Sequence, residues 1–163
     1  MKLENICNYA SHIFYYTFYF KVESKLNKWL LKIPHQSTNM NEIVRNKLIA
    51  TARAKGEQTI TYQELSDQCE LGLVMRDSEY ARSEIGRILG EISAYEHRHE
   101  RPLLSALVLT KGSNYEGDGF FKICEELGFG PWRKLQKDIT FPIIQMKRCY
   151  AFWKDEENFG RYY

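Results

Sequence analysis

The residues best suited to chemistry lie in the middle of the chain, where basic and hydroxyl side chains recur along one predicted helix. Arg82, Ser83 and Arg87 belong to this helix, and a glycine-rich loop follows at 111–119. A helix with such an exposed side can enter the major groove of DNA while flanking basic residues contact phosphates. The residues that we expect at a DNA-binding surface are Tyr62, Arg76, Arg82, Ser83, Arg87, Lys111, Asn114 and Tyr115.

The alternative interpretation of this segment is a solvated helix face. Glu79, Glu84 and Glu91 stand among the basic residues, and acids weaken the phosphate contacts that normally dominate affinity. The net charge of the chain is only +2, from 23 Lys and Arg against 21 Asp and Glu. Overall charge therefore does not imply nucleic acid by itself, because typical DNA-binding domains are more basic.

Other chemistry has weaker support. Glu116 and Asp118 are the most suggestive pair in a set of carboxylates that also includes Glu91 and Glu96. Paired carboxylates serve metal binding or general acid–base catalysis, so a small enzyme with a carboxylate site near the loop is an alternative. His97 and His99 lean to different faces of a continuing helix and favour no shared metal. We predict no catalytic residue, no metal ligand and no cofactor.

The cysteines and the N-terminus bear on location. The four cysteines are scattered, with no C-x-x-C pair, which is typical of buried thiols in a reducing cytoplasm. The aromatic run at 13–20 is far shorter than the roughly 20 residues of a spanning helix, so we expect no transmembrane span. Residues 21–33 have apolar side chains at helical spacing with lysines between them, which fits an amphipathic helix.

Apolar periodicity and turn residues predict the elements that would position these groups. The polar stretch at 34–41 reads as a linker, so we expect an accessory helical extension at 1–39 and one domain at 40–163. The predicted elements are helices at 41–55, 62–69 and 78–98, an extended piece at 59–61, a strand at 103–110, a hairpin loop at 111–119, a short helix at 120–127, a helical turn at 130–137, a helix from 140 and a charged, aromatic tail at 155–163.

Two local patterns add detail to these elements. Thr61 and Glu64 have the T-x-x-E spacing of a capping box. Gly86 and Gly90 lie inside the longest helix, where each costs roughly 1 kcal/mol relative to alanine, so we expect another backbone to approach closely there. The fold class is α+β and mostly helical, with a winged-helix-like centre, a small sheet and helical N- and C-terminal extensions.

Four segments together resemble the winged-helix DNA-binding domain of alkylguanine-DNA alkyltransferases. ITYQELS at 60–66 resembles the family's V-T-Y-G-x-I-A, and ARSEIGRIL at 81–89 resembles its A-R-x-V-G-x-A-L recognition helix. RPLLSALV at 101–108 occupies the place of the I-P-C-H-R-V-V active-site strand, and KGSNYEGDG at 111–119 that of its glycine-rich wing. The order agrees over 57–119, and it implies that Arg82 stands near the base-flipping arginine of the family.

The departures from that family concern its chemistry. Leu103 stands at the reactive cysteine, and Leu104 and Ser105 at the histidine and arginine that follow, so alkyl transfer is not expected. Arg82 also precedes Gly86 by four residues where the family has three. The chain also resembles small uncharacterised bacterial proteins.

We expect a non-catalytic binding module for duplex DNA. The alternative is a protein–protein interaction module of a bacterial cytoplasmic complex, using the aromatic C-terminal third or the 21–33 segment.

Overall fold

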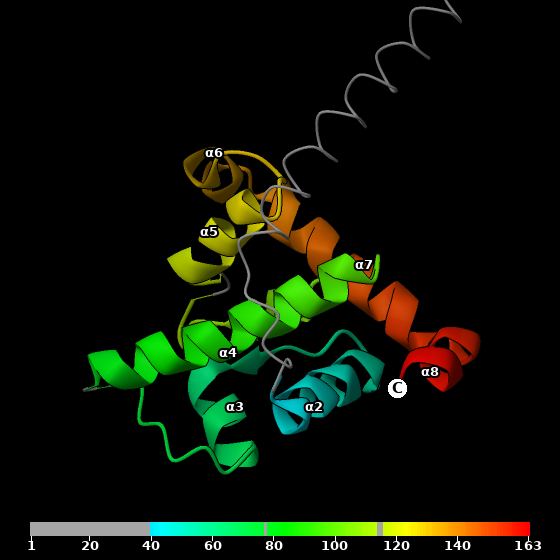
Figure 1. Cartoon of the computed structure of the whole chain (residues 1–163), viewed down its shortest axis with the longest axis horizontal. Coiled ribbons are helices and arrows are strands. Elements are labelled where there is room, and N and C mark those ends of the chain that lie inside the picture. The colour runs from blue at the N-terminus through cyan, green and yellow to red at the C-terminus, as the bar shows by residue number, and fades with distance from the viewer. Residues whose placement is uncertain (1–39, 77, 114–115) are drawn as a thin grey trace, which may run out of the picture. The chain divides into compact units, whose positions relative to one another are not determined.

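The computed structural model describes residues 40–76, 78–113 and 116–163 (Figure 1). The chain divides into two units, Met1–Asn39 and Met40–Tyr163, and the described residues belong to the second. The predictions for the extension at 1–39, with its aromatic run at 13–20, its amphipathic segment at 21–33 and Cys7, therefore lie outside the described residues, as do those for Asn114 and Tyr115.

The described unit is α+β and mostly helical, as the sequence predicts. In chain order its elements are α2 (Glu42–Arg53), β1 (Ile60–Thr61), α3 (Tyr62–Gln68), α4 (Glu79–Arg98), the 3₁₀ helix η1 (Leu104–Leu107), β2 (Val108–Leu109), α5 (Asp118–Glu126), α6 (Trp132–Lys137), α7 (Thr140–Lys154) and α8 (Glu156–Tyr162).

Side-chain caps fix where several helices begin. Asn41 and Ser78 accept hydrogen bonds from backbone N–H groups in the first turns of α2 and α4. The predicted capping box of α3 is confirmed: the Thr61 hydroxyl accepts from the Glu64 backbone N–H, and the Glu64 carboxylate accepts from the Thr61 backbone N–H at 2.8 Å. These bonds satisfy N–H groups that lack partners within the helix.

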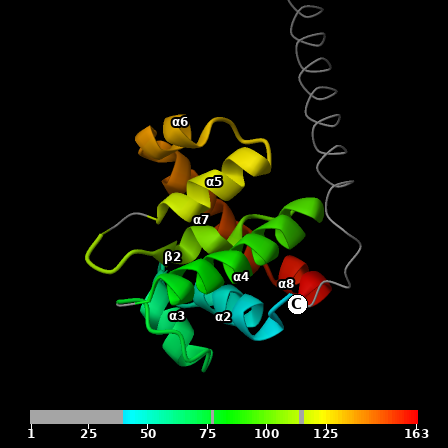
Figure 2. The ribbon, with the colours of Figure 1, turned by 60° about the vertical axis from the view of Figure 1, so that its left-hand side comes forward.

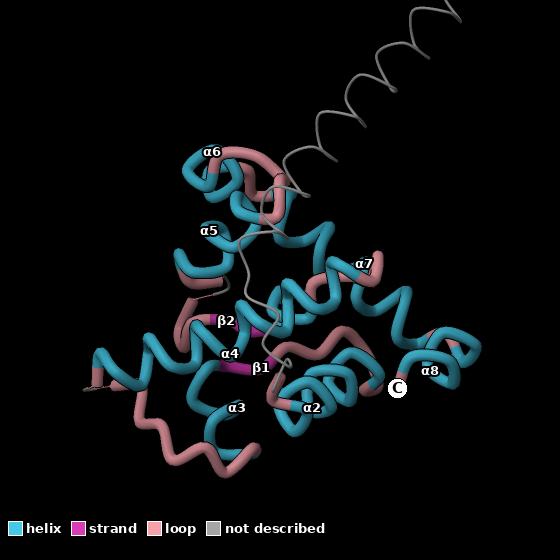
Figure 3. The backbone as a smooth tube through the Cα atoms, in the orientation of Figure 1, coloured by secondary structure: helices cyan, strands magenta, loops and turns pink. Residues whose placement is uncertain are grey.

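The sheet is smaller than the sequence predicts, and it is parallel. β1 and β2 pair with Ile60 opposite Val108 and Thr61 opposite Leu109 (Figure 3). The strand expected at 103–110 is mostly wrong, because residues 104–107 turn as η1 and only 108–109 extend. The hairpin expected at 111–119 is also wrong, since the described residues after β2 contain no returning strand and lead into α5.

α4 runs through the middle of the unit. α2 and α3 lie on one side of it and α5 and α6 on the other, with α7 behind it, and both views agree on this order (Figures 1 and 2). η1 is contacted by α2, α4 and α7. The apolar run at 103–110, which suggested a strand, therefore contributes the buried 3₁₀ helix η1 to the centre of the core.

One apolar cluster holds these elements together. Its largest fully buried members come from α2, α3, α4, η1 and α7: Leu48, Ile49, Leu65, Ile85, Ile92, Leu104, Leu107 and Trp153. Most aromatic residues of the C-terminal third belong to the interior or are half-buried. The exposed large apolar side chains of α7 and the residue before it are instead Ile139, Ile143 and Ile144.

A buried ion cluster lies next to this core. The Glu96 carboxylate of α4 is fully buried and accepts from both the Arg45 and Arg101 guanidinium groups. Arg45 also donates to the backbone carbonyl of Tyr162, at 3.0 Å. The cluster thereby fastens α8, which the sequence did not predict as a helix and which buries no residue of its own.

The glycines of α4 have a different setting from the one we expected. A Cβ atom built on Gly86 or Gly90 would meet nothing within 4 Å. No close backbone approach therefore explains them, and the expectation is wrong. Gly86 instead borders a pocket.

Candidate functional site

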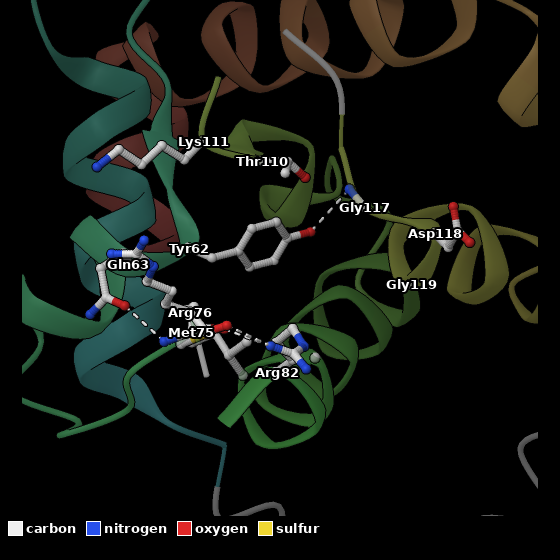
Figure 4. A pocket seen from close by; sticks show the side chains of 12 residues that line it. Tyr62, Gln63, Met75, Arg76, Arg82, Thr110, Lys111, Gly117, Asp118 and Gly119 are labelled. Atoms are coloured by element: carbon white, nitrogen blue, oxygen red, sulfur yellow. Dashed lines mark hydrogen bonds between the residues drawn. The ribbon is translucent and has the colours of Figure 1, made fainter. Parts of the chain in front are cut away.

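A pocket of about 950 Å³ gathers four of the predicted DNA-binding residues (Figure 4). Tyr62 reaches it from α3, Arg76 from the loop before α4, Arg82 from α4 and Lys111 from the segment after β2. The other residues that line it are Gln63, Met75, Ile85, Gly86, Thr110, Gly117, Asp118 and Gly119. Segments that are far apart in the sequence thus converge on one concave surface.

The parallel sheet explains this convergence. Because β1 and β2 run in the same direction and in register, their carboxyl ends meet at one edge. Tyr62 directly follows β1, and Thr110 and Lys111 directly follow β2. If β1 and β2 were antiparallel, the residues that follow them would lie at opposite ends of the pair.

Tyr62 joins the two sides of the pocket. Its hydroxyl accepts a hydrogen bond from the Gly117 backbone N–H at 3.2 Å. Burial raises the pKa of Tyr62, so the phenol is neutral at physiological pH. A Cβ atom on residue 117 would lie 3.1 Å from the Tyr62 hydroxyl oxygen, so glycine fits this contact best.

The pocket rim is predominantly basic. Arg76, Arg82 and Lys111 are the basic residues of the lining, and its one acid is Asp118, which accepts from the Gln136 side chain at 2.6 Å. The Glu64 carboxylate does not line the pocket, but its pKa is lowered first by its hydrogen bonds with Thr61 and further by the charge of Lys111. Asp118 also opens α5, whose first turn has no side-chain cap. A helix N-terminus carries partial positive charge, so it adds to the positive field of the rim.

Arg82 has a structural task as well as an exposed position. One of its Nη atoms donates to the Met75 carbonyl at 2.7 Å and lies 3.4 Å from the Arg76 carbonyl. The remaining guanidinium donors of Arg82 have no hydrogen-bond partner among the described residues. Arg76 is exposed and forms no ion pair with any residue that the structure describes.

The other two described residues of the predicted set lie outside the pocket. Ser83 is exposed on α4. Arg87 is held between Glu84, at 2.7 Å, and Glu91 of the same helix. These two carboxylates raise the pKa of Arg87 and neutralise its charge locally.

Glu116 lies buried just before the pocket-lining glycines. The residue is only 6% exposed, and neither carboxylate oxygen has a hydrogen-bond partner. Burial raises the pKa of Glu116 to about 7. The ionisable neighbours that interact with it are Tyr62 and Cys124, and burial raises the pKa of the Cys124 thiol to about 12.

The remaining candidates do not assemble into a reaction centre. Glu91 pairs with Arg87, and Glu96 is enclosed by arginines, so the four carboxylates do not converge. The buried Ser105 hydroxyl lies 2.6 Å from that of Ser93. Among residues 40–76, 78–113 and 116–163, no group of three or more His, Cys, Asp or Glu is placed to hold a metal ion.

Within the described residues, the histidines and cysteines also have structural contacts rather than an arrangement for catalysis. His97 is half-buried with its ring 5.3 Å from that of Phe129, and burial, then the nearby Arg148 charge, lowers its pKa. His99 Nδ1 lies 2.7 Å from a backbone carbonyl of α4. Cys69, Cys124 and Cys149 are buried free thiols, as predicted.

Some pocket residues gave no signal in the sequence. Gln63, Met75 and Thr110 look like ordinary helix or loop residues, and only the pairing of β1 with β2 and the path of the loop bring them together. Gly86 did stand out, because a glycine inside a helix needs a reason.

Comparison with family models, with curated proteins and with solved structures found no match to this chain. Within the described part of the chain, no helix combines the length and apolarity needed to cross a membrane.

Proposed function

We propose that this protein is a non-catalytic module that binds DNA through the surface around the pocket. The observation that carries the proposal is the convergence of Arg76, Arg82 and Lys111 on one concave face beside the exposed side of α4. Phosphate contacts from basic side chains supply most of the affinity for DNA. A charge concentrated on one face is effective although the chain as a whole is nearly neutral.

The division of labour follows from the partners of each side chain. Arg76 and Lys111 are exposed and contact phosphates. Arg82 contacts phosphates with the guanidinium N–H groups that are not bonded to the carbonyls of Met75 and Arg76. Ser83 and Tyr80 stand exposed near the N-terminus of α4, the end of a recognition helix that meets base edges. Tyr80, 73% exposed, is a residue that the sequence analysis did not select.

The pocket extends this surface with a place for a group outside the double helix. Its interior includes the apolar Met75 and Ile85 and the ring of Tyr62, and its rim is cationic. An unstacked nucleotide combines a flat base with an anionic phosphate, and aromatic side chains take up such bases by stacking. We therefore expect duplexes with an unpaired nucleotide to bind more tightly than fully paired ones.

Fluorescence anisotropy with labelled single-stranded, duplex and mismatched DNA across a salt series tests the proposal. We expect binding that weakens steeply with salt. The Arg76→Ala/Lys111→Ala variant should lose about 0.9 of the salt slope for each phosphate contact removed. Lys55→Ala/Arg161→Ala is the matched control, because it removes equal charge at residues that do not line the pocket. An equal loss in both double variants would show that only net charge matters.

One specific observation favours a second candidate, a protein–protein interaction module. Ile139, Ile143 and Ile144 are 62%, 41% and 52% exposed. The first two of them border a groove of about 360 Å³ with Pro142 and Met146. Clustered exposed aliphatic side chains are typical of interaction surfaces. Failure to bind DNA at low salt would favour this candidate.

A further inference from the structure

Residues 73–76, in the segment that joins α3 to α4, reach the rim of the pocket at Met75 and Arg76, and we call them the strap. Leu73 and Met75 turn inward and pack against the core, whereas Val74 between them is 59% exposed. Arg76 follows, also exposed. This alternation is that of an extended chain, although the segment pairs with no strand.

Side chains take the place of a partner strand. The Gln63 side-chain oxygen accepts from the Met75 backbone N–H at 2.8 Å, and its amide nitrogen donates to the Leu73 carbonyl at 3.1 Å. The Ser66 hydroxyl both donates to the Leu73 carbonyl and accepts from its N–H. Arg82 of α4 donates a hydrogen bond to the Met75 carbonyl.

The Gln63 amide is itself held in one orientation. Its nitrogen also donates to the Asp67 carboxylate at 2.7 Å, one turn along α3. Because the oxygen faces a donor and the nitrogen faces two acceptors, only this orientation of the amide satisfies all three contacts. Gln63 therefore links α3 to the strap through hydrogen bonds in a single orientation of its amide.

We propose that Gln63 is a positioning residue that holds the strap so that Arg76 is presented to the DNA backbone. The inference rests on the proposed function. A long arginine side chain loses conformational freedom when it binds, and a fixed backbone beneath it lowers what remains to be ordered, which is the benefit of preorganisation. Gln63 acts through Arg76, so its own contact with DNA is not required.

A double-mutant cycle tests this inference. Gln63→Ala is expected to weaken duplex binding about tenfold in the otherwise unchanged protein, and less than about twofold in an Arg76→Ala background, since residues that act together are not additive. Gln68→Ala is the matched control, because Gln68 lies on the same helix, is exposed and forms no hydrogen bond with the strap. It should leave affinity unchanged in both backgrounds.

Amide hydrogen exchange supplies a readout without DNA. The Met75 N–H should exchange at least about tenfold faster in Gln63→Ala than in the unchanged protein, because its acceptor is gone. Gln63→Met, which retains the side-chain volume, replaces Gln63→Ala should the latter unfold. Equal affinity in Gln63→Ala and the unchanged protein, or an equal loss in both backgrounds, would overturn the inference. No DNA binding by the unchanged protein would instead overturn the proposed function, whatever the exchange rate of Met75.

Discussion

Replacing Glu116 with glutamine should stabilise the protein, and the gain should grow with pH. The Glu116 carboxyl is buried without a hydrogen-bond partner, and burial raises its pKa from 4.5 to about 7. In the unfolded chain the carboxyl loses its proton near its ordinary pKa, whereas in the folded protein it keeps the proton until about pH 7. Between these values the folded state binds more protons than the unfolded state, so stability falls as pH rises.

The magnitude follows from the size of the shift. Each pKa unit corresponds to about 1.4 kcal/mol, so the free energy of unfolding should lose about 3 kcal/mol in total across this window. Glutamine has nearly the same shape and cannot ionise. The difference in stability between Glu116→Gln and the unchanged protein should therefore rise from under about 1 kcal/mol at pH 5 to about 3 kcal/mol at pH 8.

Urea unfolding monitored by circular dichroism at pH 5, 6, 7 and 8 provides the assay. Glu125→Gln is the control, because this glutamate lies on α5 but is exposed, and its variant should track the unchanged protein at every pH. A stability difference for Glu116→Gln that stays the same from pH 5 to pH 8 would refute the reasoning, since it would mean that the carboxyl binds no more protons in the folded state than in the unfolded state, so that folding does not raise its pKa.

Three further predictions concern residues of α4. Glu96→Gln should lower the free energy of unfolding by roughly 3–5 kcal/mol in urea unfolding, because it leaves the buried Arg45 and Arg101 without a counter-charge. A loss below about 1 kcal/mol would contradict this account of the buried ion cluster. Gly86→Ala and Gly90→Ala should each raise stability by up to about 1 kcal/mol, since neither Cβ meets an obstacle. Of these two glycines, only Gly86 borders the pocket, so Gly86→Leu should weaken DNA binding whereas Gly90→Leu should not. Equal effects of the two variants would argue against use of the pocket.

Local signals in the sequence predicted much of the helical framework. The capping box at Thr61 and the helix predicted at 78–98 depend on residues within one or two turns, and both are confirmed. The strand at 103–110 failed for a physical reason. A short apolar run is equally compatible with any fully buried backbone, and contacts with α2, α4 and α7 decide that most of it turns as η1.

The site could be predicted only in part. Tyr62, Arg76, Arg82 and Lys111 were selected for their chemistry, and the structure brings them together. The roles within the site depend on contacts between distant segments: the bonds from Gln63 to the strap span ten and twelve residues. No periodicity or motif encodes such bonds, because they arise only once the helices pack.

The salt dependence of duplex DNA binding by the unchanged protein tests the central claim most directly. With three cations on the pocket rim and about 0.9 of slope for each phosphate contact, the logarithm of the association constant should fall with the logarithm of salt concentration with a slope near −3. Binding that does not change with salt, or no binding at the lowest salt concentration, would contradict the assignment of this face to DNA.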